Sequence, residues 1–486
     1  MLQNINSKSF PFQESDLSIK DLNKKMSLLQ REYIMKNIPV IFVIDGWESS
    51  GRGYCVNRLV KKLDTKHYRV SIFTKEKQEN FCFFTKQNWK NLPANGDFAF
   101  FVRSYYDLLF NNCKLGQREL EDAIEKIKDF EGLVQADGCL ILKFFLHQSL
   151  EEQEEAIRDL FSREYEEVLV DKKDKHQNKN YQDYLRHMDL VLEKSNFSSA
   201  SWQVIPSGNR KAMTKEILLR SIQALEEHLM HWDQKEEKEF EKLHSPKYLE
   251  KLDLTKSIEK KEYKIKKEEL QKQARKLSFA LYANQVPSII VFEGNDASGK
   301  GGCIDRLVAE MDARSYHINP TSAPNDQEKD HHYLWRFYNN LPKKGQLAIF
   351  DRSWYGRVLV ERIEGFAQEE EWRRAYDEIN RMEEVLAKDG YLIMKFLLST
   401  SKEEQKRRFT AREEEKPYKI TDEDWRNREK WDDYELAMND MLALTNTDYA
   451  PWFLISSEQK EWARIQVLKH YVEEVEKFIH KHVWMK

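Results

Sequence analysis

Short apolar runs alternate with amphipathic stretches along the chain. The runs include PSIIVF (287–292), GQLAIF (345–350), GYLIMKFLL (390–398) and WFLIS (452–456). The stretches between them, such as residues 370–390, have helical periodicity. Near-continuous apolar strands separated by helices are typical of a parallel sheet that is covered on both faces. The pattern therefore predicts an α/β fold in which helices flank a parallel sheet.

The same pattern occurs twice. The segment PVIFVIDGWESSGRGYCVNRLV, which starts at Pro39, aligns with PSIIVFEGNDASGKGGCIDRLV, which starts at Pro287. Two more pairs of segments align, residues 92–106 with 341–355 and residues 138–153 with 390–405. A repeat this long indicates two copies of one domain, because solenoid repeats have far shorter periods.

The two copies are joined by a charged stretch. Residues 233–276 are rich in Lys and Glu and carry an apolar stripe of Leu249, Leu252, Leu254, Tyr263 and Leu270. We expect a solvated helical connector here rather than an interaction tail. The predicted divisions are a first domain over 1–235, the connector over 236–276 and a second domain over 277–486.

Composition limits the partners. A chain of 486 residues is too long for a single domain with one hydrophobic core. Its content of 40% hydrophobic and 12% aromatic residues is sufficient for packed domains. The net charge is -4, with 79 basic and 83 acidic residues. The overall charge therefore does not attract nucleic acid or an anionic membrane. We predict neither as a partner, and any polyanion must meet a local basic patch.

Cysteine usage and hydropathy predict a soluble cytoplasmic protein. The five cysteines are scattered, odd in number and without metal-ligand spacing, which favours reduced, buried thiols. The start of the sequence lacks the apolar segment of a signal peptide, and no stretch approaches the length of a membrane span.

The second copy contains a complete phosphate-binding motif. Gly294 to Lys300 fits G-x-x-x-x-G-K between a predicted strand and a predicted helix. The loop can turn backbone N–H groups onto a phosphate, the helix N-terminus adds a favourable dipole, and Lys300 adds a point charge. We expect phosphate contacts from Lys300 and from Gly294, Asn295, Ala297, Ser298, Gly299, Gly301 and Gly302.

Two carboxylates are candidates for metal binding. Gly301 stands where such loops carry the Ser or Thr that binds Mg²⁺, so other oxygens must hold the metal. Asp296 lies inside the loop, and Asp351 ends the strand GQLAIF in the manner of a Walker B aspartate. A helix cap or turn residue is the alternative for Asp351.

Several basic residues could neutralise phosphate charge. Arg352 and Arg357 follow Asp351, although surface ion pairing is the alternative for Arg357. Further along, Arg408 and Arg412 share one helical face, with Lys416 and Lys419 beyond them. We expect this charged helix to form a lid over the phosphates, and a merely solvated face is the alternative.

The combination EGNDASGKGG, LWRFYNNLP, FDRSWYGRVLVERIEGF, EEQKRRFTARE and YKITDEDWRNREKWDDY resembles the polyphosphate kinase 2 family. The resemblance is close from about residue 277 to 470 and diffuse from about 36 to 225. It implies two tandem P-loop kinase-like domains, each with a helical lid, that need Mg²⁺ and transfer phosphoryl groups between inorganic polyphosphate and a nucleotide.

For tandem members the resemblance implies that AMP and polyphosphate give ADP and a shorter chain. It assigns Lys300, Arg352, Arg408 and Arg412 to phosphates, Asp296 to positioning the acceptor phosphate and Asp351 to the metal. The residues alone leave the donor open, since ATP would use the same groups. An ATP-dependent nucleotide kinase, polyphosphate-dependent phosphorylation of ADP and a non-catalytic polyphosphate sensor are the alternatives.

The first copy lacks several of these groups. Its loop, DGWESSGRG, has Arg52 in place of Lys300 and Glu48 in place of Asp296, and Val102 replaces Asp351. Gapless alignment puts Ala156 and Leu160 over Arg408 and Arg412, whereas a small gap pairs Arg163 with Arg412. We predict that this copy does not catalyse and either packs against the second, replacing the partner subunit of a single-domain relative, or holds polyphosphate weakly. A homodimer is left open.

Overall fold

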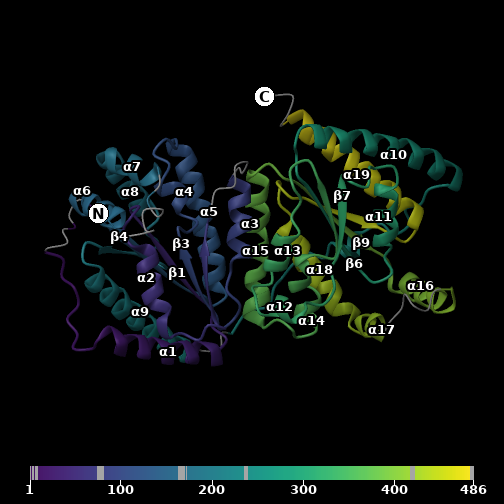
Figure 1. Ribbon diagram of the computed structural model, residues 1–486. Helices are drawn as coiled ribbons and strands as arrows, with labels where there is room; N and C mark the ends of the chain where they lie inside the picture. Colours follow the sequence, from purple (N-terminus) through teal and green to yellow (C-terminus); the bar gives the residue numbers. More distant parts are fainter. Residues whose placement is uncertain are drawn as a thin grey trace. The chain divides into compact units, whose positions relative to one another are not determined.

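The computed structural model describes residues 9–73, 81–162, 172–234, 239–415 and 422–481, together with residues 2, 5 and 170 (Figure 1). Contacts within the chain divide it into two compact units. The first comprises Met1–Glu237 with Asp326–Trp335, and the second comprises Lys238–Asn325 with Arg336–Lys486. Among the described residues, no helix is both long and apolar enough to cross a membrane.

Each unit is built on a five-stranded parallel sheet (Figure 1). The first sheet has the order β2 (Tyr68–Ile72), β3 (Phe98–Val102), β1 (Val40–Gly46), β4 (Leu140–His147) and β5 (Trp202–Pro206). The second has the order β7 (Tyr316–Pro320), β8 (Leu347–Asp351), β6 (Ser288–Gly294), β9 (Leu392–Ser399) and β10 (Trp452–Ser456). The two orders are equivalent, which confirms the predicted tandem α/β domains.

Helices flank both sheets, as the apolar runs predict. The first copy contributes α1 (Ile19–Met35), α2 (Arg52–Leu59), α3 (Phe81–Lys90), α4 (Asp107–Phe110), α5 (Gln117–Ala136), α6 (Leu150–Phe161), α7 (Lys172–Lys179), α8 (Tyr181–Lys194) and α9 (Arg210–Asp233). The rest of the chain contributes α10 (Lys260–Ala283), α11 (Lys300–Val308), α12 (Asp326–Lys329), α13 (Trp335–Asn339), α14 (Val360–Ile363), α15 (Glu369–Lys388), α16 (Lys402–Glu415), α17 (Asp422–Glu429), α18 (Trp431–Thr445) and α19 (Lys460–Ile479).

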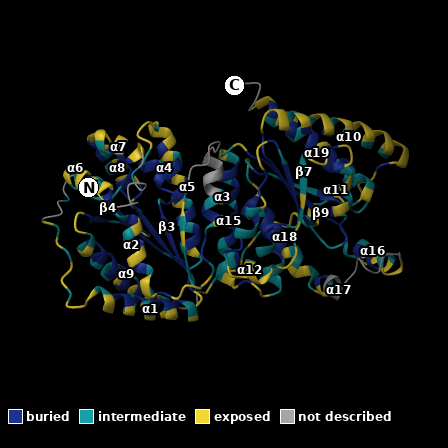
Figure 2. Cartoon of the chain, viewed as in Figure 1, coloured by how far each residue is buried: buried dark blue, intermediate teal, exposed yellow. Residues whose placement is uncertain are grey.

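The cores lie on the faces of the sheets, where Figure 2 shows the strands as buried. In the first unit, Val40, Phe42 and Ile44 of β1 pack with apolar residues of α1, α2 and α9. Side chains alternate along a strand, so Ile41 and Val43 point to the opposite face, and both are fully buried. In the second unit α10, α11 and α19 supply the equivalent layer.

A buried ion pair recurs in both units. Lys395 Nζ of β9 lies 2.7 Å from Glu383 Oε2 of α15, and Lys143 Nζ of β4 lies 3.0 Å from Glu131 Oε2 of α5. The four side chains are at most 1% exposed, so each charge needs its partner. A lysine inside an otherwise apolar strand is therefore a shared structural feature of the two copies.

The connector differs from the prediction. Over residues 239–259 the chain forms only the 3-10 turn Leu249–Lys251, and the helix α10 begins at Lys260. The expectation of a helix throughout is wrong because Pro246 has no N–H to donate and disfavours helix in the residue before it. Asp253 also accepts hydrogen bonds from Thr255 N (2.9 Å) and Oγ1 (2.6 Å), which favours a turn.

Three of the predicted buried thiols are confirmed. Cys55, Cys139 and Cys303 are buried and free, and burial raises the pKa of Cys55 and Cys303 to about 12. Cys113 is free but exposed, so the prediction is wrong there. It lies in the loop between α4 and α5. The side chain of Cys82 lies outside the described residues.

Candidate active site

The phosphate loop of the second copy connects β6 to α11. Gly294 has φ +134°, and a Cβ there would lie 2.0 Å from Leu398 O, so only glycine fits. Gly299 has φ +100° and precedes the first helical residue, Lys300. Lys300 Nζ donates to Gly294 O at 2.8 Å and to Asn295 O at 3.2 Å. Burial, together with nearby Arg352, lowers the pKa of Lys300 from its usual value.

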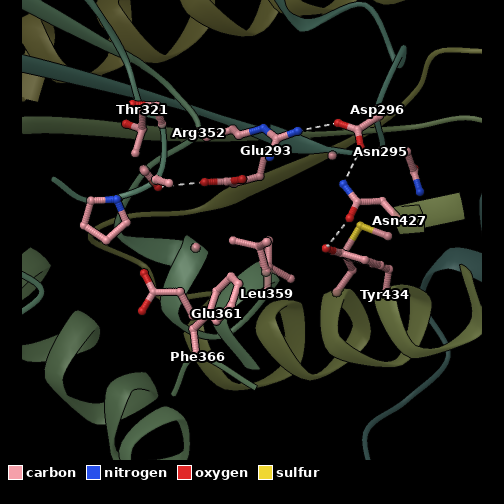
Figure 3. Close-up of a pocket in the computed structure, with 18 of the residues that line it drawn as sticks. Glu293, Asn295, Asp296, Thr321, Arg352, Leu359, Glu361, Phe366, Asn427 and Tyr434 are labelled. Carbon is pink, nitrogen blue, oxygen red and sulfur yellow. Dashed lines mark hydrogen bonds and ion pairs between the residues drawn. The ribbon is translucent and has the colours of Figure 1, made fainter. Parts of the chain in front are cut away.

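The loop carboxylate is held on both oxygens. Asp296 Oδ1 pairs with Arg352 Nη2, and Oδ2 accepts from Asn427 Nδ2 at 2.9 Å (Figure 3). Its backbone oxygen accepts from Gln405 Nε2 at 3.1 Å. Burial raises the pKa of Asp296, but Arg352 and Lys300 more than offset this and hold it below the usual value. The group is therefore charged at neutral pH.

Asp351 lies beside this loop at the end of β8. The parallel register pairs it with Phe292 of β6, and it lines the same cavity as Lys300 and Asp296. Within the described part of the chain, no hydrogen bond or ion pair engages its carboxylate, nor do three His, Cys, Asp or Glu side chains gather into a metal cage. One or two carboxylates completed by phosphate oxygens are nevertheless what Mg²⁺ commonly uses. The site fits Mg²⁺, with Asp351 better placed than the fully engaged Asp296.

The backbone after Asp351 is unusual. Arg352 has φ +63°, which is uncommon for a residue with a side chain, and its N–H donates to Phe292 O at 3.0 Å. Next to it, Ser353 Oγ donates to Glu293 Oε1 at 2.8 Å. Burial raises the pKa of Glu293 to about 7. This geometry turns the Arg352 side chain toward Asp296.

A basic cavity of about 650 Å³ opens on one side of the loop. Besides the loop, Asp305, Pro320, Thr321 and Asp351, it is lined by Arg352, Arg407, Arg408, Arg412, Lys460 and Arg464. Lys460 is exposed to solvent. Partial desolvation of its ammonium group, together with the nearby charge of Arg408, lowers its pKa. The cavity thus combines backbone N–H groups of the helix N-terminus with a concentration of cations.

A second cavity, here called the mixed cavity, has a volume of about 380 Å³ (Figure 3). Apolar and aromatic side chains form much of it, including Leu359, Val360, Phe366, Trp431, Tyr434 and Met438. Polar groups come from Glu293, Asn295, Arg336, Glu361 and Asn427. Asp296, Arg352 and Thr321 line both cavities. The carboxylate–guanidinium pair therefore stands where the two cavities meet.

The predicted lid arginines have different environments. Arg408 is buried, and its guanidinium donates to Ala297 O (2.9 Å), Ser457 O (2.6 Å) and Glu458 O (3.0 Å). It thus ties the loop to the turn before α19. Arg412 lines the basic cavity, and no described residue forms a hydrogen bond or ion pair with it.

Other predicted residues lie elsewhere. Arg357 lines neither cavity, and its Nη1 lies 3.1 Å from Glu361 Oε2. This contact is the ion pairing that the sequence offered as its alternative. Lys416 and Lys419 lie outside the described residues.

Comparison with known proteins identifies the family. The family model of polyphosphate kinase 2 matches residues 12–236 and again residues 257–482. The chain belongs to the polyphosphate kinase 2 family. The resemblance inferred from the sequence motifs is confirmed, and both units contain a polyphosphate kinase 2 domain.

Relatives match over almost the whole chain. A polyphosphate:AMP phosphotransferase from Pseudomonas syringae pv. tomato is 36% identical over 459 residues, which is 90% of each chain. A polyphosphate:AMP phosphotransferase from Pseudomonas aeruginosa is 34% identical and covers 91% of this chain and 92% of its own. A crystal structure from Pseudomonas aeruginosa PA01, described as a polyphosphate kinase 2, aligns with a TM-score of 0.80 at 32% identity and covers 95% and 96% of the two chains.

In the loop of the first polyphosphate kinase 2 copy, charged side chains contact one another and the loop backbone. Arg52 Nη1 donates to Gly46 O at 3.1 Å, the same kind of carbonyl that Lys300 contacts. Glu48 pairs with Arg52 and with Arg103 Nη2 (2.7 Å), and its N–H donates to Gln177 Oε1 at 2.8 Å. Glu48 is 1% exposed. The loop carboxylate of the first copy is thus paired with two arginines, whereas Asp296 of the second copy is held by one arginine and one asparagine.

The strand register supports the predicted loss of the metal carboxylate. Val102 pairs with Ile44 in the first sheet as Asp351 pairs with Phe292 in the second. Val102 is an apolar residue that is 8% exposed, and it supplies no oxygen ligand from its side chain.

Several site residues were missed by sequence reasoning. Asn427 holds Asp296, and Lys460 and Arg464 line the basic cavity, but all three are distant from the loop in sequence. Gln405 had a usable signal, because it ends the repeated EEQ segment. Gln153, its counterpart, donates to Glu48 O at 3.4 Å, as Gln405 does to Asp296 O.

Proposed function

We propose that the chain transfers the terminal phosphoryl group of inorganic polyphosphate to AMP, giving ADP and a polyphosphate chain one unit shorter. The observation that carries the proposal is the junction of the two cavities at Asp296 and Arg352. A donor in one cavity and an acceptor in the other would place their reacting phosphates at the same pair of side chains.

The basic cavity suits a polyanionic donor. Its lining cations, together with the N-terminus of α11, could form charge-assisted hydrogen bonds with the oxygens of a bound phosphate chain. Arg412 and Lys460 are the side chains best able to follow the chain away from the loop, since Arg408 is committed to backbone oxygens. Its 650 Å³ can hold several phosphate units of a linear chain.

The mixed cavity suits a nucleoside monophosphate. Its volume of about 380 Å³ lies in the range of small-molecule sites. Apolar and aromatic walls would pack on a base, and the polar groups near Asn427 and Arg352 would orient the phosphate. The relatives named polyphosphate:AMP phosphotransferase support AMP as this acceptor.

The residues at the junction can support phosphoryl transfer without covalent help. An oxygen of the AMP phosphate forms a new P–O bond to the terminal phosphorus of polyphosphate, and the bond from that phosphorus to the shortened chain breaks. Lys300 and Arg352 offset the negative charge on the transferred group. Asp296 holds the guanidinium of Arg352 through their ion pair. Arg352 can in turn orient the acceptor phosphate.

Mg²⁺ fits this site as a cofactor. Asp351 would hold it, and when bound it would add positive charge beside the phosphate oxygens. Asp296 could join as a second carboxylate only by giving up its contact with Arg352 or Asn427. The free buried thiols support a reducing cytoplasm as the compartment.

The donor is tested by incubating the protein with Mg²⁺, AMP and either polyphosphate or ATP, and by separating the nucleotides by ion-exchange chromatography. We expect ADP from AMP with polyphosphate and no ADP above the protein-free control with ATP. If ADP forms from AMP with ATP but not from AMP with polyphosphate, the donor is ATP and the proposal is wrong. Polyphosphate binding without any ADP would instead indicate a sensor.

A further inference from the structure

Residues of two helices line neighbouring parts of the mixed cavity. Leu359, Val360 and Glu361, at the start of α14, line it together with Tyr434 and Met438 of α18 (Figure 3). α14 is a short helix, Val360–Ile363, and α18 is much longer, Trp431–Thr445. The width of the cavity therefore depends on what holds α14 against α18.

An ion pair connects the two helices behind the cavity. Arg362 Nη1 of α14 lies 2.8 Å from Asp440 Oδ2 of α18. The Asp440 side chain is 0% exposed and that of Arg362 is 14% exposed. Arg362 Nη1 also donates to Tyr376 OH at 3.0 Å, and its guanidinium lies 4.1 Å from the centre of the Trp372 ring. These contacts fix the guanidinium in one orientation.

A second ion pair lies at the other end of α14. Lys430 Nζ, just before α18, is 2.9 Å from Glu364 Oε1, just after α14. The side chains are 39% and 20% exposed, so solvent screens this pair more than the first. Arg362 and Asp440 are therefore the stronger connection.

The first copy has the same fold without this connection. Asn196 accepts from Trp202 N (2.7 Å) as Asn446 accepts from Trp452 N (2.8 Å), which fixes the alignment of α8 with α18. That alignment puts Leu190 in the place of Asp440, and Leu190 is 41% exposed. The first copy thus carries an uncharged, exposed residue where the second copy has the fully buried Asp440.

We propose that Arg362 and Asp440 are positioning residues that set the width of the mixed cavity and so the affinity for the nucleotide acceptor. The inference rests on the proposed function of that cavity. It explains why the pair occurs in the copy with the complete loop. A buried ion pair contributes little net stability compared with apolar residues of similar size, so stability alone does not account for it.

The decisive variant replaces both partners. Arg362→Met with Asp440→Leu removes both charges and gives α18 the residue that the first copy carries. We expect its Tm to stay near that of the parent, because no buried charge is left unpaired. We expect the Kd and the KM for AMP to rise about tenfold while kcat and the KM for polyphosphate stay nearly unchanged.

The singles and a control complete the experiment. Asp440→Leu alone should lower Tm, and Arg362→Lys should restore part of the AMP affinity that Arg362→Met loses, since a lysine keeps the charge but not the guanidinium contacts. Glu216→Leu with Arg220→Met removes a pair in the first unit whose carboxylate is 1% exposed, and it should leave AMP affinity unchanged.

The outcomes separate this inference from the proposed function. A double variant that binds AMP with the parent's Kd would overturn the positioning role. If the parent binds AMP and the double variant shows the predicted loss of AMP affinity, but the parent makes no ADP from polyphosphate, the proposed reaction is overturned and the positioning role of Arg362 and Asp440 stands. A parent that binds no AMP at millimolar concentration would overturn both.

Discussion

At the residue scale, the two copies share the loop backbone and differ in the side chains that the loop and the neighbouring strand carry. Both loops retain the glycines with positive φ. In each copy an arginine with positive φ, Arg103 or Arg352, comes directly after the neighbouring strand, β3 or β8. The differences are Arg52 for Lys300 and Val102 for Asp351. In the first copy the guanidinium of Arg52 contacts both Gly46 O and the carboxylate of Glu48, whereas Lys300 of the second copy contacts the backbone oxygens of Gly294 and Asn295.

Asp351 gives the residue-scale prediction. Asp351→Asn keeps the size of the side chain but removes the charge that favours Mg²⁺, so we expect a higher half-saturating Mg²⁺ concentration and a kcat lower by roughly 10². Initial rates over a Mg²⁺ titration measure both. Val102→Ala, at the matching position of the first copy, is the control and should leave the titration unchanged. Parent-like Mg²⁺ dependence in Asp351→Asn would contradict the metal role.

At the element scale, α16 has two roles on one helix. Arg408 donates to backbone oxygens of the loop and of the turn before α19, whereas Arg412, one turn on, lines the basic cavity. A sequence shows only that the two share a face. Which of them is buried depends on the elements that pack against the helix.

These positions predict that an alanine variant of Arg408 loses stability, whereas an alanine variant of Arg412 loses affinity for polyphosphate. Arg408→Ala leaves three backbone oxygens without their donor, so we expect the free energy of unfolding to fall by about 2–4 kcal/mol. Arg412→Ala should raise the KM for polyphosphate several-fold without a change in Tm. Thermal unfolding and initial rates distinguish the two. A lower Tm for Arg412→Ala, or a parent-like Tm for Arg408→Ala, would contradict this division.

Local patterns explain which elements could be predicted. The apolar runs mark the strands, and the loop motif marks its own turn, because both follow from neighbouring residues. The partner of Asp296 on α17, Asn427, and the ion pair between Lys395 and Glu383 depend on contacts between distant segments. The connector was predicted as helical from its Lys- and Glu-rich composition and its apolar stripe. The helix α10 forms only from Lys260 onward, and Pro246 and the Asp253 turn favour non-helical backbone before it.

At the scale of the whole molecule, duplication separates the fold from the chemistry. The first unit repeats the strand order, the buried Lys143–Glu131 pair and the loop backbone. It lacks counterparts of Lys300, of the strand-end carboxylate Asp351 and of Asp440 in the ion pair with Arg362. We propose that only the second unit catalyses, while the first contributes a folded domain.

The most direct test of this account compares Lys300→Ala with Arg52→Ala in the full-length chain, by rates of ADP formation from AMP and polyphosphate. Circular dichroism and thermal unfolding establish that each variant is folded. We expect Lys300→Ala to lower kcat by at least about 10³ and Arg52→Ala to retain the parent's kcat within about twofold. Comparable losses of kcat in two folded variants, or full activity in Lys300→Ala, would contradict the assignment of catalysis to the second unit.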